Sequence, residues 1–185
     1  MAEFRLETLR LILRDWRADD WPPFFAGTNT PPVMRWLGGV MDEAAEGASR
    51  QRLEGRAREH GHTFWAVERK ADGAILGFCG LKKADQAGAP IGDFEIGWRL
   101  REDAWGQGYA REAAEAAMAA GFEHFGAPHI VALTVEGNAA SWGLMRRLGM
   151  ERRADLDFAS AEFDPVSGRI IVHSITRAQW QAGRA

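Results

Sequence analysis

The sequence has one cysteine, one tyrosine and no excess of basic charge, and each shortage excludes a class of protein. The single cysteine, Cys79, excludes an intramolecular disulfide and fits a reducing, cytoplasmic compartment. It lies in an apolar run, so we expect a buried structural thiol. A net charge of −3 provides no broad basic surface, and general nucleic-acid binding is therefore not expected. No apolar run approaches the length of a membrane span, and the N-terminus lacks the apolar segment of a signal peptide.

What is present is a globular composition, with 46% hydrophobic and 26% charged residues over 185 positions, which predicts one domain. Alternating apolar residues and turn signals predict strands, and Ala-rich or capped stretches predict helices. Strands are expected at residues 9–15, 63–69, 74–82, 93–100, 130–135, 150–158 and 169–176, and helices at 21–26, 41–60, 110–125 and 139–148. The Asp72-Gly73 pair predicts a hairpin. This order predicts a mixed α/β fold.

The most informative stretch joins the expected strand 93–100 to the Ala-rich helix 110–125. It reads Trp105, Gly106, Gln107, Gly108, Tyr109, Ala110. Two glycines leave main-chain N–H groups uncovered by side chains, and the first turn of a helix adds unpaired donors and a positive dipole end. Such a turn is suited to a phosphate or a diphosphate.

Two common phosphate-binding loops are excluded by the residues that follow the second glycine. A Walker A loop ends in Gly-Lys-Ser/Thr, whereas Gly108 precedes Tyr109 and Ala110. A Rossmann fingerprint requires a small residue at position 111, which is Arg111. A tight strand-to-helix turn without a ligand remains an alternative for the turn taken alone.

A second motif supports a ligand. Residues 135–141 (Val-Glu-Gly-Asn-Ala-Ala-Ser) run from a strand end into a helix, which closes with residues 144–150 (Leu-Met-Arg-Arg-Leu-Gly-Met). Together with the glycine turn, they make the chain resemble the GNAT N-acetyltransferase superfamily, and most closely its RimJ/RimL-like branch of ribosomal-protein N-terminal acetyltransferases. Residues 8–14, 95–98 and 172–180 agree, so that the resemblance covers nearly the whole chain.

The resemblance implies a single acetyltransferase domain over residues 1–185. Its α/β (α+β) fold has a mixed, mostly antiparallel sheet of about six to seven strands, splayed at its centre, with about four helices. Acetyl-CoA would lie where strands 93–100 and 130–135 separate, with its pantetheine on main-chain groups of Trp98 and Leu100. Its pyrophosphate would lie on the amides of Trp105, Gly106, Gln107, Gly108, Tyr109 and Ala110. In the superfamily this turn commonly begins with Gln or Arg, where this chain has Trp105. A tryptophan at that position is frequent in the branch that the chain resembles.

Acetyl transfer requires a neutral amine, so a general base is expected. Glu95 is the candidate because it alternates with Phe94 and Ile96 and projects from the opposite sheet face near the splay. It could act through a water. A carboxylate satisfied by a neighbouring donor is the alternative interpretation, and Asp93 is a weaker candidate base.

The departing thiolate needs a hydrogen-bond donor. Many superfamily members use a tyrosine in the helix after the second strand, but the only tyrosine here, Tyr109, lies in the glycine turn. Ser141 occupies the matching helix and is the candidate donor. Asn138 could bind the cofactor while capping that helix, and capping alone would also explain it.

The predicted function is therefore transfer of an acetyl group from acetyl-CoA to a primary amine by direct attack. The acceptor would be a protein N-terminus or a small amine, with specificity residing in residues 27–39 and 159–168, and with Trp21 and Trp36 as candidate lining. A non-catalytic acyl-CoA-binding module of the same fold is the alternative. The five histidines have no metal-ligand spacing, so no metal is expected. The sequence also allows a homodimer through the sheet edge or the final hairpin.

Overall fold

The computed structural model describes residues 3–160 and 169–184, and its elements follow the predicted alternation. The strands are β1 (Arg5–Glu7), β2 (Leu11–Arg14), β3 (Phe64–Arg69), β4 (Ile75–Lys83), β5 (Phe94–Leu100), β6 (His129–Val135), β7 (Glu151–Arg152), β8 (Phe158–Ala159) and β9 (Arg169–Thr176). The helices are α1 (Trp21–Thr28), α2 (Pro31–Met34), α3 (Glu43–His60), α4 (Tyr109–Glu123), α5 (Ala139–Arg147) and α6 (Arg177–Ala182), with 3-10 turns η1 (Ala18–Asp20), η2 (Glu102–Ala104) and η3 (Ala154–Leu156).

These strands form one sheet in the order β1-β2-β3-β4-β5-β6-β9-β7, and β8 pairs with β9. Every pairing is antiparallel except the one between β5 and β6, which is parallel. That pairing covers only Phe94 with Ile130 and Glu95 with Val131. Since β5 continues to Leu100 and β6 to Val135, the two strands are not paired with each other beyond Glu95 and Val131, although each stays paired with its outer neighbour. The predicted splay at the centre of a mostly antiparallel sheet is confirmed.

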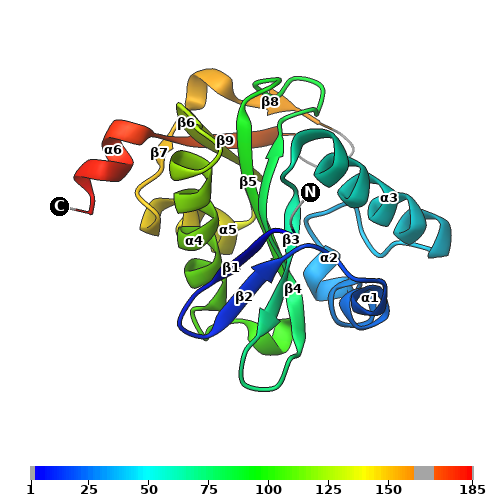
Figure 1. The fold of residues 1–185 in the computed structure, drawn as a ribbon. Helices are drawn as coiled ribbons and strands as arrows, with labels where there is room; N and C mark the ends of the chain where they lie inside the picture. The colour runs from blue at the N-terminus through cyan, green and yellow to red at the C-terminus, as the bar shows by residue number, and fades with distance from the viewer. Residues whose placement is uncertain (1–2, 161–168, 185) are drawn as a thin grey trace.

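Helices cover both faces of the sheet (Figure 1). One face carries α4 and α5, and the other carries α1, α2 and α3. Small residues let α4 approach the sheet closely: Ala113 and Ala117 are fully buried, and a Cβ on Gly121 would lie 2.8 Å from Ile130 Cδ1. Cys79, on β4, is buried in this larger core, and burial raises the pKa of its thiol. The predicted structural thiol is confirmed. Within the described ranges, no helix is long and apolar enough to cross a membrane.

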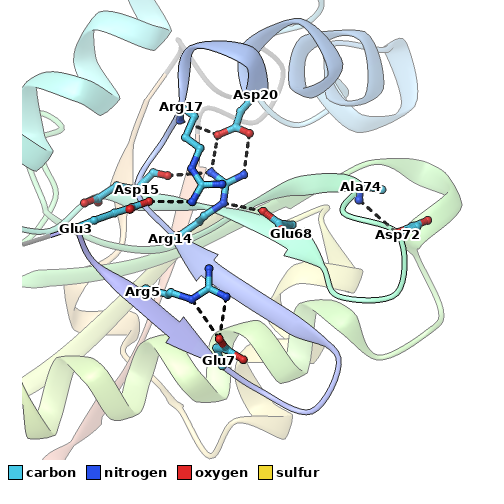
Figure 2. A network of polar contacts seen from close by, with 10 residues as sticks. All are labelled: Glu3, Arg5, Glu7, Arg14, Asp15, Arg17, Asp20, Glu68, Asp72 and Ala74. Carbon is cyan, nitrogen blue, oxygen red and sulfur yellow. Dashed lines mark hydrogen bonds and ion pairs between the residues drawn. The ribbon is translucent and has the colours of Figure 1, made fainter.

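Helices α1 and α2 together cover one face of the sheet, and we call them the α1–α2 cover. The start of this cover is joined to the sheet through a buried arginine (Figure 2). Arg14, on β2, donates from Nη1 and Nη2 to the two carboxylate oxygens of Asp20 at 2.7 and 2.8 Å. Its Nε donates to Glu68 on β3 at 2.7 Å. Burial alone would raise the pKa of the Asp20 carboxyl, but the hydrogen bonds from Arg14 and from the Arg17 amide lower it on balance. The network fixes where α1 leaves the sheet.

The predicted final hairpin is wrong on its first side. Residues 150–158 were expected to form one strand, but the chain there forms two short strands, β7 and β8, separated by η3. Asp157 is the physical reason: its carboxylate accepts from the Val172 amide at 3.1 Å and is paired with Arg152. A side chain that bonds main-chain and guanidinium donors in this way replaces strand pairing locally. β9 lies where the second side of the hairpin was predicted.

The described residues contain six helices rather than about four, and an additional strand, β1. Pro31 and Pro32 open α2 instead of only ending α1, since proline is favoured in the first turn of a helix. Thr176 and Gln179 form a reciprocal capping box that starts α6. The strand predicted at 9–15 is shorter, Leu11–Arg14, because residues 8–10 form the turn to β1.

Candidate active site

The glycine turn has the main-chain conformation that the sequence predicts. Gly106 and Gly108 have φ values of 71° and 80°, a region that a side chain disfavours, and α4 begins at Tyr109. Trp105, Gly106, Gln107 and Gly108 are exposed. Within the described chain, the amides of Tyr109 and Ala110 have no hydrogen-bond acceptor, as helix geometry requires of a first turn. The turn therefore presents unpaired N–H groups to solvent beside the positive end of a 15-residue helix.

Trp105 stabilises this turn with its side chain. The indole Nε1 donates to the Leu100 carbonyl at 2.8 Å, while 49% of the residue stays exposed. Gln107 folds back as well, and its amide nitrogen donates to the Asp103 carbonyl. Both side chains thus lie against the strand exit and the η2 turn. The Trp105 amide donates to the Glu102 carbonyl at 2.9 Å, so this amide, predicted to bind the pyrophosphate, is not free, whereas the amides of Gly106, Gln107 and Gly108 have no acceptor among the described residues.

The β1–β2 hairpin also holds the glycine turn in place, through hydrogen bonds that the sequence did not predict. Arg10 Nη1 donates to the Gln107 carbonyl at 2.9 Å, and its guanidinium lies 4.3 Å from the centre of the Tyr109 ring. Glu112, in the first turn of α4, accepts from Arg10 Nε at 2.7 Å and from the Thr8 hydroxyl at 2.6 Å. The Thr8-Leu9-Arg10 sequence was noticed as part of the resemblance, but nothing local connects it to a partner 102 residues away.

The splay leaves main-chain groups of β5 free on one side. Hydrogen bonds of an antiparallel strand alternate between its two sides. The Arg101 amide donates to Leu76 of β4, and the Asp93 carbonyl accepts from the Ala84 amide, so odd-numbered residues of β5 bond β4. The main-chain groups of Trp98 and Leu100 therefore point toward the gap beside β6, although Trp105 already occupies the Leu100 carbonyl. This orientation agrees with the prediction of a ligand chain pairing at these two residues.

Glu95 lies at the narrow end of the splay, on the face covered by α1 and α3, as predicted from its alternation with Phe94 and Ile96. It is only 9% exposed, and Lys82 Nζ lies 2.8 Å from its Oε2, without the alignment of a hydrogen bond. Lys82 also contacts Asp85 at 2.6 Å. Burial raises the pKa of the Glu95 carboxyl, and Lys82 opposes that rise. Asp93, the weaker candidate, is paired with His129 at 2.8 Å.

The other side of the splay ends at the cap of α5. Asn138 is the N-cap residue, and its side-chain oxygen accepts from the Ser141 amide at 3.3 Å. The predicted capping is therefore confirmed. Ser141 is half-buried in the first turn of α5. Trp36 packs over the same loop, because a Cβ on Gly137 would lie 2.9 Å from its ring. Trp36 thus links the α1–α2 cover to the end of β6, whereas Trp21 is buried in the core beneath α1.

A match between this chain and known acetyltransferases decides the family. The sequence profile of the acetyltransferase (GNAT) domain matches residues 10–151, which include the glycine turn, Glu95 and the α5 cap. The chain belongs to the GNAT acetyltransferase family. A Bacillus subtilis protein, YkkB, is 30% identical over 150 residues, covering 80% of this chain and 86% of that protein. The N-acetyltransferase YnaD of the same organism is 27% identical over 150 residues, covering 80% and 82%.

Solved structures show the GNAT fold directly. An acetyltransferase from Agrobacterium tumefaciens superposes with a TM-score of 0.78 at 23% identity, over 96% of each chain. A ribosomal-protein-S5-alanine acetyltransferase from Vibrio fischeri superposes with a TM-score of 0.74 at 16% identity, over 96% of this chain and 98% of that one. Identities this low establish the shared fold and nothing finer.

GNAT enzymes use acetyl-CoA, and the residues of this chain fit it: the turn offers unpaired N–H donors, and the splay offers a free strand edge. In the part of the chain that the structure describes, no group of three or more potential metal ligands is found. The predicted specificity segment 27–39 contains the end of α1 and the whole of α2. Of the other segment, 159–168, residues 161–168 lie outside the described residues.

Substituting Gly108 with alanine is expected to weaken acetyl-CoA binding about 10-fold. A Cβ at φ 80° costs about 1–2 kcal/mol and would lie 3.4 Å from Arg10 Nη2, which holds the turn in place. Isothermal titration calorimetry with acetyl-CoA measures the change. Gly126→Ala is the matched control, because Gly126 has φ 70° and open space around it at the far end of α4. Equal binding losses in both variants would contradict a role for the turn.

Proposed function

We propose that this GNAT protein transfers an acetyl group from acetyl-CoA to a primary amine by direct attack of the amine on the thioester. One observation carries the proposal: the unpaired edge of β5 leads directly into the turn of exposed N–H groups at the start of α4. A ligand with an extended amide chain and a diphosphate fits both features at once, since strand edges bind amides and helix N-termini bind phosphates.

Glu95 is the proposed general base. It lies where β5 and β6 separate, and its carboxylate can accept a proton from the attacking amine directly or through a water. An α-amino group with a pKa of about 8 is about 10% neutral at pH 7, whereas a lysine side chain with a pKa of about 10.4 is far less so. That difference corresponds to roughly 3 kcal/mol of activation, so a lysine acceptor needs the base more strongly.

Ser141 is the proposed donor to the departing sulfur. When the tetrahedral intermediate collapses, the carbon–sulfur bond breaks and the thiolate of coenzyme A leaves, stabilised by a hydroxyl that donates to it. Ser141 faces this task from the first turn of α5, where the helix dipole also favours negative charge. Tyr109 is not available for it, because it is buried beneath Arg10 at the diphosphate end of the site.

A second function, a non-catalytic acyl-CoA-binding module, is favoured by one contact. The Lys82 ammonium group is paired with the Glu95 carboxylate, and a carboxylate held by an ammonium group is a weaker base. The cofactor cleft would bind acetyl-CoA equally well in such a module. Only turnover distinguishes the two functions.

The deciding experiment is acetyl-CoA turnover with a mixed library of small amines and peptides, read by mass spectrometry. We expect acetylated products that carry the added mass on a primary amine. A thermal-shift series with acetyl-CoA, coenzyme A, ATP and NAD accompanies it, and only the first two should raise Tm, since a ligand stabilises the state that binds it. Stabilisation by acetyl-CoA without any acetylated product would favour the binding module instead.

A further inference from the structure

A buried arginine on the acceptor side of the sheet has no anionic partner among the described residues. Arg99, near the end of β5, is only 7% exposed, and its Nε and Nη2 atoms are buried without a hydrogen-bond partner. Its Nη1 donates to the sulfur of Met34 at 3.2 Å. The guanidinium lies 4.7 Å from the Phe24 ring centre and 5.0 Å from that of Phe78. The guanidinium of Arg99, which carries a positive charge and five N–H donors, is therefore surrounded by two aromatic rings and a thioether.

This arrangement is costly for a protein that uses the arginine only for packing. A buried charge is normally paired with an opposite one, because its lost hydration is worth several kcal/mol. Burial lowers the pKa of Arg99 to about 10, and only the more distant charge of Glu46 opposes this. The Glu46 carboxylate is itself bonded to the Asn29 amide at 2.7 Å. A thioether sulfur is a weak acceptor, so the present partner of Arg99 is one that an anion would readily replace.

The cover over Arg99 can adjust to admit such an anion. Met34 is the last residue of α2, a helix of four residues, and the chain beyond it passes through Gly38 and Gly39 with φ values of 87° and 88°. Methionine side chains are unbranched and repack easily. The Thr30 hydroxyl, at the N-cap of the same short helix, is also buried without a partner. The short helix that contacts Arg99 through Met34 thus begins at a second unsatisfied polar group.

Arg99 and Glu95 project from the same sheet face, four residues apart on β5, which separates their Cα atoms by about 13 Å. Between them the face is apolar: a Cβ on Gly97 would lie 2.7 Å from the Phe64 ring, which stacks on Phe78 at 4.9 Å. An acceptor lying across this floor would place its amine toward Glu95 and its other end at Arg99. The Arg99 end lies against Met34 of α2 and Phe24 of α1, and the Glu95 end lies beside Lys82 of β4.

We propose that Arg99 binds the carboxylate of the acceptor, which makes the substrate class small amines whose carboxylate is well separated from the acetylated amine, such as amino acids with a side-chain amine, rather than uncharged amines or polyamines. This inference rests on the proposed acetyl transfer and names its acceptor. The guanidinium fork binds a carboxylate through two parallel N–H···O bonds, and its orphaned Nε and Nη2 are one such pair.

The test compares amino acids that carry a side-chain amine with their carboxamides as acceptors, in the wild type and in Arg99→Met, Arg99→Lys and Arg52→Met. We expect the wild type to prefer the amino acids by at least about 10-fold in kcat/KM, since charged hydrogen bonds distinguish such pairs strongly. Arg99→Met should abolish this preference, and Arg99→Lys should retain part of it. Arg52, exposed on α3, is the matched control, and Arg52→Met should leave the preference unchanged.

Stability and cofactor affinity separate this role from a structural one. Arg99→Met should leave the acetyl-CoA Kd unchanged. It should leave Tm unchanged or raise it by about 2–4 °C, because an apolar side chain replaces an unpaired buried charge. A lower acetyl-CoA affinity would assign the guanidinium to the cofactor and overturn the proposal, as would a wild type with equal kcat/KM for both acceptor types.

If no amine is acetylated, the proposed transfer itself fails. Calorimetric titration of the same amino acids into the CoA-saturated protein and its Arg99→Met variant then decides the carboxylate site: tighter binding to the wild type supports it, and equal or absent binding overturns it.

Discussion

Glu95→Gln is expected to lower kcat/KM for the amine about 100-fold or more while leaving the acetyl-CoA Kd unchanged. A glutamine keeps the size of the side chain but cannot accept a proton, and a positioned general base contributes about 10²–10⁴-fold. Steady-state kinetics with saturating acetyl-CoA and varied amine measure the loss. The pH profile adds a second readout. Burial raises the pKa of Glu95, so the carboxylate that acts as base is gained as pH rises through that raised value.

The wild-type profile should therefore contain an acid limb that the glutamine variant lacks, in addition to the ionisation of the amine itself. Asp93→Asn is the matched control, because Asp93 is held by His129 at the start of the β5–β6 pair. It should reduce kcat/KM by less than a few-fold. Unchanged turnover in Glu95→Gln would remove the assigned role, and a fall in Asp93→Asn alone would transfer it to Asp93.

Asp20→Asn is expected to lower the free energy of unfolding by about 3 kcal/mol, since it removes the bidentate one of the two carboxylate partners of a buried arginine. Arg14 and Asp20 are both nearly inaccessible, with 3% and 8% of their side chains exposed. Chemical unfolding in urea at neutral pH measures the change. Because α1 begins directly after Asp20, we also expect the variant to lose order in α1 before the rest of the sheet unfolds.

The control has the same two residue types on the surface. Asp72 accepts from Arg69 through both carboxylate oxygens, but it lies exposed in the β3–β4 turn, and Asp72→Asn should leave the urea midpoint nearly unchanged. The Asp20 contribution also depends on pH. Its pKa is lowered in the folded protein, so this stability is present above pH 4 and is lost as pH falls through the folded pKa. A difference between wild type and Asp20→Asn that persists at the lowest pH would contradict this assignment.

Local features of the site were predictable from the sequence because each depends on neighbouring residues. The paired glycines require positive φ values, Asn138 is placed to cap the next turn, and Glu95 faces opposite Phe94 by the geometry of a strand. The element order could also be predicted, since turn signals and alternation are local. Residues 150–158 were misread because one carboxylate, Asp157, rearranges the backbone through partners beyond the segment.

Contacts between distant segments were not predictable in the same way. Arg10 meets Glu112 only because the β1–β2 hairpin lies beside the start of α4. Lys82 meets Glu95 through the register of β4 and β5, which a single sequence does not specify. Arg99 has an ordinary place in an alternating strand, and only the packing of α1 and α2 reveals that its charge is unpaired. These residues carry the charges of the site. The chemistry of the site therefore depends on tertiary contacts, whereas its backbone conformation depends mainly on local sequence.

The free edge of β5 has a consequence for how this protein can change. In the proposed complex, peptide groups rather than side chains grip the cofactor, and every residue except proline supplies the same amide there. Substitutions along this edge can therefore accumulate without altering the choice of cofactor. Replacing Met34 or Arg99, which come from the cover and the opposite face, would instead redirect the enzyme to new acceptors. Outside Glu95 and the glycine turn, the strand edge that holds the cofactor thus tolerates many substitutions, whereas the residues that face the acceptor are where selection can act.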